Sequence, residues 1–228
     1  MNTPSHHRLR LFDLEKYREI QPIIEGISKR DTSVEVERVI SMIKSAENIV
    51  RSDDFKKYNP DYIYEDYAED LHDVLDILEN NSLQIWFDKL DRHENEFNTV
   101  LEMCVTSICC PKYQWNTDDR EPEQISGTCI DYTEFYYRCR ENDLEILELL
   151  NFRENPTEML PFNPDDRGIF TGIFNKQQLE KLARSSAEDI YSSSEFIGMY
   201  IEIYHDINFL LELANTRDNY TILNEESW

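Results

Sequence analysis

The chain has 228 residues and a formal net charge of −24, from 23 Lys and Arg against 47 Asp and Glu. This charge disfavours binding to nucleic-acid phosphate or to an anionic membrane and makes a basic protein the most natural macromolecular partner. The 13 Tyr, 11 Phe and 3 Trp supply apolar surface that disordered chains lack, so we expect a folded protein.

Helical periodicity dominates the first half of the chain. Apolar residues recur at helical spacing over residues 11–26, 32–50, 61–79 and 82–110. We expect Pro22 to kink the first of these helices or to split it into two. Thr32 and Glu35 form a T-x-x-E capping box that predicts the start of the second.

The second half has two irregular connections between further helices. Residues 111–130 mix Pro, Gly, Asp and Ser without a period, which marks the only plausible internal boundary. Helical spacing returns over 132–150, although the aromatic run there also fits a strand. Asn175 with Gln178 indicates another helix start, and Ser192 with Glu195 indicates the start of a last helix that ends near residue 214.

These elements predict an all-α fold. About seven or eight helices, joined by mostly short connections, are most simply packed as a multi-helix bundle. We expect a single α-helical domain over residues 1–228, with a minor strand pair near 160–175 as an alternative for that segment.

Two segments share the pattern E-x-x-H, which pairs Glu69 with His72 and Glu202 with His205. In ferritin-like bundles, such pairs on two helices join carboxylates from two other helices to form a di-iron site. At about 100° per residue, however, His72 lies at the flank of its apolar stripe and the other three side chains fall away from theirs. A metal-dependent helical enzyme using these four residues is therefore an alternative and not the first prediction.

The histidines, cysteines and glycines give no stronger catalytic signature. The doublets 72–73 and 205–206 also fit an HD-type metal phosphohydrolase, but only His6 and His7 lie upstream to supply its further ligand. Cys109 and Cys110 are adjacent thiols without a C-x-x-C motif, which favours a role as small buried hydrophobes. With five glycines and no phosphate-binding motif, the sequence predicts no cofactor.

The cysteines and the hydropathy also indicate a compartment. Five cysteines are an odd number, and residues 1–12 carry charges and histidines where a signal peptide needs an apolar run. No apolar stretch approaches the roughly 18 residues that span a bilayer. We therefore expect a cytoplasmic protein with reduced thiols.

The acidic residues are concentrated in one region of the chain. Residues 61–96 hold twelve Asp and Glu against one Lys and one Arg, a net charge of −10 out of −24. Such a region is either a solvated surface or a docking face for a cationic partner. The residues proposed to bind this partner are Asp61, Glu65, Asp66, Glu69, Asp70, Asp73 and Asp76.

Our first functional hypothesis is a non-enzymatic interaction protein. It would bind a basic protein through the acidic region, as immunity, antitoxin and inhibitor proteins do, without contacting nucleic acid or membrane. The metal-dependent enzyme described above is the second hypothesis. A homodimeric scaffold or regulatory adaptor is the third, and an exposed apolar patch would be its mark.

Overall fold

The computed structural model describes residues 6–53, 55, 64–80, 83–90, 94–110, 127–131, 158–161, 170–192, 205, 207–215 and 218–227. The chain forms two compact units. Residues 13–112 make up one, which we call the helical unit, and residues 1–12 with 113–228 make up the other, the sheet unit. The boundary after Lys112 falls within the segment predicted as a possible boundary, while the number of domains stays a prediction.

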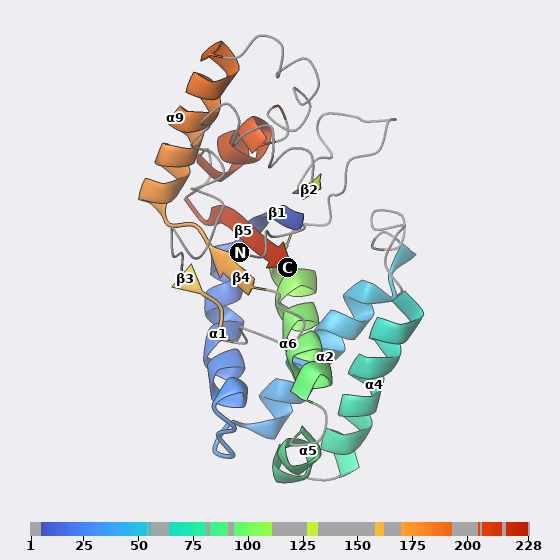
Figure 1. Cartoon of the computed structure of the whole chain (residues 1–228). Coiled ribbons are helices and arrows are strands. Elements are labelled where there is room, and N and C mark those ends of the chain that lie inside the picture. The colour runs from blue at the N-terminus through green and yellow to red at the C-terminus, as the bar shows by residue number, and fades with distance from the viewer. Residues whose placement is uncertain are drawn as a thin grey trace. The chain divides into compact units, whose positions relative to one another are not determined.

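The helical unit contains five described helices (Figure 1). They are α1 (Leu14–Ser28), α2 (Val36–Val50), α4 (Tyr64–Asn80), α5 (Leu83–Leu90) and α6 (Glu94–Cys109). α2 packs against α4 and α6, and α1 packs against α6. The predicted helix over 82–110 is described as the two elements α5 and α6, and residues 91–93 between them lie outside the description. The apolar stripes predicted for these helices form their buried core.

Local hydrogen bonds define the two ends of α1. Asp13 caps its N-terminus, and the helix continues as one element through Pro22, so the proline does not split it. At its other end, the amides of Arg30 and Asp31 donate to the carbonyls of Ile27 and Gly26 at 2.8 and 2.9 Å, which is a Schellman motif.

The connection that follows delays the start of α2. The Asp31 side chain accepts from the amide of Ser33 at 2.8 Å, which holds a turn. A Cβ at Gly26 would clash with the side chain of Val34, so this tight connection requires glycine. α2 therefore begins after Glu35 rather than at Thr32, and no side-chain bond caps it. The predicted capping box is wrong.

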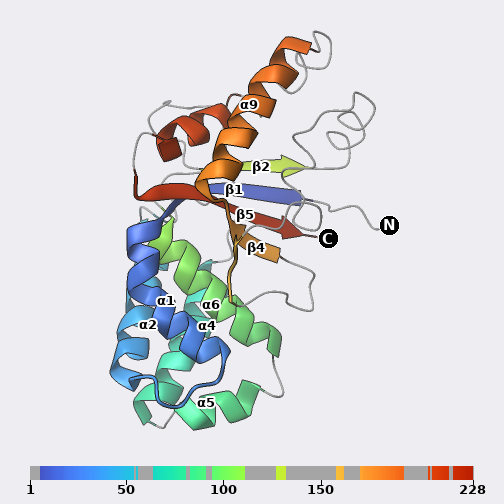
Figure 2. The same ribbon diagram turned by 90° about the vertical axis from the view of Figure 1, so that its left-hand side faces the viewer.

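The sheet unit contains a five-stranded sheet that the all-α prediction omits. Its strands are β1 (His6–Asp13), β2 (Gly127–Asp131), β3 (Glu158–Met159), β4 (Phe170–Ile173) and β5 (Tyr220–Ser227), in the order β2-β1-β5-β4-β3. The pairs β1–β2, β3–β4 and β4–β5 are antiparallel. Strands β2, β1, β5 and β4 lie side by side in this order in Figure 2. Only β3 and β4 correspond to the strand pair considered near 160–175, so the described chain is mostly helical but not all-α.

Where their side chains are described, strands β1, β4 and β5 are buried on both faces and carry buried polar side chains. In β5 the consecutive residues 221–225 are all buried, although three of the five are polar. Arg10 of β1 reaches Glu225 of β5, with 3.2 Å between Nε and Oε2, and these side chains are only 10% and 4% exposed. Thr171 of β4 lies directly across from Glu225 in the register. The sheet therefore contains an ion pair shielded from water.

Helices complete the described part of the sheet unit. α9 (Lys176–Ser192) starts as predicted, because Asn175 and Gln178 exchange hydrogen bonds between their amides and side chains at 2.9 and 3.0 Å. In the predicted last helix, residues 205 and 207–215 are helical, and residues 193–204, which include the predicted capping residue Glu195, lie outside the description. Among the helices described in either unit, none is long and apolar enough to cross a membrane.

Candidate acidic docking face

Helix α4 separates apolar from acidic side chains. Its buried residues are Ala68, Leu71, Val74, Leu75 and Leu78. Glu69, Asp73 and Asp76 are exposed, and their spacing of four and three residues places them along one side of the helix. At 1.5 Å per residue this row is about 10 Å long. We call these three residues the acidic face.

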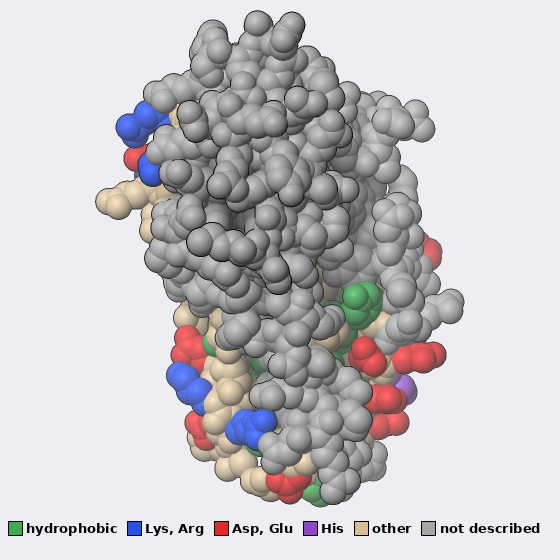
Figure 3. Space-filling view, in the orientation of Figure 1, with side chains coloured by type: hydrophobic (Ala, Val, Ile, Leu, Met, Phe, Trp, Pro, Cys, Tyr) green, Lys and Arg blue, Asp and Glu red, His purple; other side chains and the backbone are tan. Residues whose placement is uncertain are grey.

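The structure places the other predicted docking residues as follows. Asp70 is half-buried on α4. Glu65 and Asp66 belong to the first turns of α4, but their side chains are outside the description, as is the whole of Asp61. In Figure 3 acidic side chains gather over the α4 region of the described surface, and a histidine lies among them. The predicted row of acids is therefore present at its described positions.

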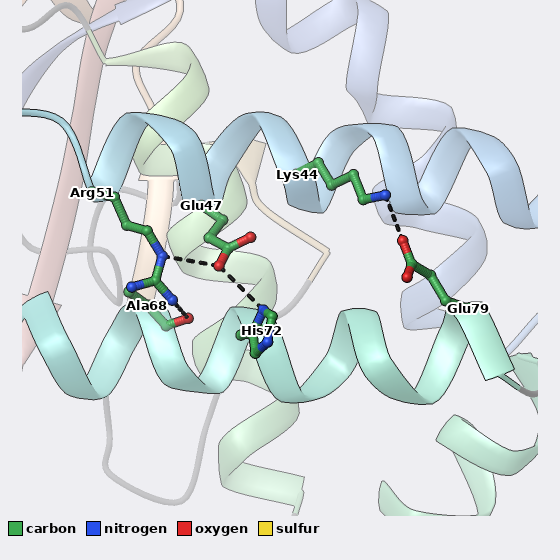
Figure 4. A network of polar contacts seen from close by, with 6 residues as sticks. All are labelled: Lys44, Glu47, Arg51, Ala68, His72 and Glu79. Carbon is green, nitrogen blue, oxygen red and sulfur yellow. Dashed lines mark hydrogen bonds and ion pairs between the residues drawn. The ribbon is translucent and has the colours of Figure 1, made fainter.

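Helix α2 contributes charged residues beside α4 that the sequence analysis does not name (Figure 4). Lys44 forms an ion pair with Glu79 of α4. Arg51 donates from Nε to Oε1 of Glu47 at 2.9 Å and from Nη2 to the carbonyl of Ala68 at 3.2 Å. These contacts tie α2 to α4 along their exposed side. The i,i+4 spacing could have indicated the pair of Glu47 and Arg51 on one helix, but not the contacts with Glu79 and Ala68 on the other.

The described ion pairs of Lys44 and Arg51 involve carboxylates other than Glu69 and Asp73. Lys44 binds Glu79, and Arg51 binds Glu47. Within the described part of the chain, neither Glu69 nor Asp73 forms an ion pair. Like charges at this spacing on a helix repel one another and cost about 0.2–0.5 kcal/mol per pair. Glu69 and Asp73 are thus exposed carboxylates with no counter-charge among the described residues.

His72 sits within this row and contacts α2. Its Nδ1 lies 3.4 Å from Oε1 of Glu47, the same oxygen that accepts from Arg51 (Figure 4). The His72 side chain is 57% exposed, while that of Glu47 is only 15% exposed. His72 therefore points outward to a carboxylate on the neighbouring helix.

The second E-x-x-H pair is described only in part. Glu202 lies outside the described residues, and His205 is exposed on a helix of the sheet unit. Glu69 and His72 belong to the helical unit. The described residues contain no group of three or more His, Cys, Asp or Glu arranged to hold a metal ion. The metal hypothesis has gained no supporting geometry and stays a prediction.

Three cysteines of the helical unit, Cys104, Cys109 and Cys110, are not joined in disulfides. Cys104 and Cys109 are buried and Cys110 is half-buried, and none of the three forms a disulfide. Burial raises the pKa of Cys104 to about 12. Burial also raises the pKa of Cys109, and the neighbouring Cys110 adds to the effect. Thiols with such high pKa values are poor nucleophiles at neutral pH, which agrees with the predicted packing role.

Comparison with protein families, curated proteins and solved structures finds no significant match to this chain.

Proposed function

We propose that the chain is a non-enzymatic interaction protein that binds a basic protein through the acidic face of α4, in the manner of an immunity, antitoxin or inhibitor protein. One observation carries the proposal. Glu69 and Asp73 are exposed on one side of α4 and form no ion pair among the described residues, although α2 holds two cations beside that helix.

The energetics of the face support a cationic partner. A row of like charges lowers stability, and opposite charges on a bound protein would relieve that repulsion. The net charge of −24 also attracts a basic partner over a distance and raises the rate of encounter. In this proposal, Asp61, Glu65, Asp66 and Asp70 extend the docking site along and ahead of the first half of α4.

We further propose that the chain binds neither nucleic acid nor anionic membranes and that it acts in the cytoplasm. The strong negative charge opposes binding to nucleic acid and to anionic membranes. A reducing cytoplasm is supported by the free thiols of Cys104, Cys109 and Cys110. A homodimer has less support, because Ile85 is the only exposed large hydrophobic residue among those described.

The test uses a lysine-rich helical peptide as the probe. Its basic residues are spaced to match the acidic face, and binding is followed by calorimetry at several salt concentrations between about 50 and 300 mM. We expect the affinity to fall as salt rises. The variant Glu69→Lys/Asp73→Lys/Asp76→Lys should bind at least about tenfold more weakly, because three pairs of about 0.5 kcal/mol each are lost and replaced by repulsion.

A matched variant controls for total charge. Glu19→Lys/Glu180→Lys/Glu212→Lys makes the same charge change at exposed acids on other helices. It should lose much less affinity than the α4 variant, because only long-range attraction is reduced. Equal losses in both variants, or binding that does not respond to salt, would contradict a specific acidic docking face.

A further inference from the structure

We draw no further inference here: the strongest candidate, the side-chain pair of Arg10 and Glu225 buried in the five-stranded sheet, is an ion pair whose carboxylate oxygens are closed to solvent, and no described residue shows an opening through which a ligand could reach them.

Discussion

The sheet buries an ion pair, whereas α4 keeps its carboxylates in water. Arg10 and Glu225 are 10% and 4% exposed and lie 3.2 Å apart on adjacent strands. Glu69 and Asp73, by contrast, are exposed on a helix surface. The chemical groups are similar, but the solvent around them differs.

This difference determines what each set of charges can do. A buried charge loses its hydration and depends on its partner, so removing that partner is strongly destabilising. An exposed carboxylate keeps its hydration, and its loss changes stability little. The exposed charges of Glu69 and Asp73 can therefore be changed at little cost in stability, while those of Arg10 and Glu225 belong to the fold of the sheet.

The largest effect is expected from Arg10→Met. This change leaves the Glu225 carboxylate buried without the guanidinium that compensates its charge. We expect the free energy of unfolding to fall by about 3–5 kcal/mol. Urea denaturation followed by circular dichroism measures this loss.

The double variant Arg10→Met/Glu225→Leu is its control. Replacing both partners with apolar residues of similar size removes the uncompensated charge, so most of the lost stability should return. If the double variant is no more stable than Arg10→Met, the loss comes from packing and not from the buried charge.

Asp13 offers an intermediate case, because it is a buried carboxylate whose partners are backbone amides. Its Oδ1 accepts from the amides of Glu15 and Lys16 at 3.0 and 3.2 Å, which caps α1. Asp13→Ala should lower the free energy of unfolding by about 1 kcal/mol, within a range of 0.5–2. Asp13→Asn retains a side-chain oxygen that can accept these bonds, so it should lose less stability than Asp13→Ala. Equal losses would show that the charge matters more than the cap.

Sequence periodicity predicts the helical unit better than the sheet. The apolar stripes of α2 and α4 recur every three or four residues, because each helix buries one side only. The strands lack the matching alternation. Both faces of β1 and β5 are buried, and polar residues such as Asn224 and Glu225 occupy buried positions that a sequence pattern assigns to solvent.

The acidic face was partly predictable from the helical periodicity of α4. Helical spacing places Glu69 and Asp73 opposite the buried stripe, and both are exposed. The contact between Glu47 and His72 was not predictable, because it joins two helices and depends on how α2 packs against α4. A local pattern finds residues on one helix but not their partners on the next.

Lys44→Met tests an ion pair in water. Lys44 and Glu79 join α2 to α4, but their side chains are 51% and 46% exposed. Solvent screening limits such a pair, so we expect a loss below about 1 kcal/mol in the urea denaturation used for Arg10→Met. A loss near that of Arg10→Met would show that burial does not determine how much these ion pairs contribute to stability.

The smallest change in the free energy of unfolding is expected for Gln21→Leu. This change depends on pH through the carboxyl of Glu25. The Gln21 amide donates to Glu25 at 2.8 Å, and this bond, assisted by Lys29, lowers the pKa of the Glu25 carboxyl. A lowered pKa in the folded state contributes stability above the unfolded-state pKa, and the contribution is lost as pH falls through the folded-state value.

Gln21→Leu removes the hydrogen bond while leaving the carboxyl in place. The stability difference between wild type and Gln21→Leu should therefore be small at neutral pH. It should shrink as pH falls from the unfolded-state pKa of about 4.3 through the lowered folded-state value, below which Glu25 is protonated in both states. Urea midpoints at neutral and acidic pH measure it. A difference that persists in acid would mean that Gln21 acts through packing, and the exposed carboxylate would then contribute nothing to stability.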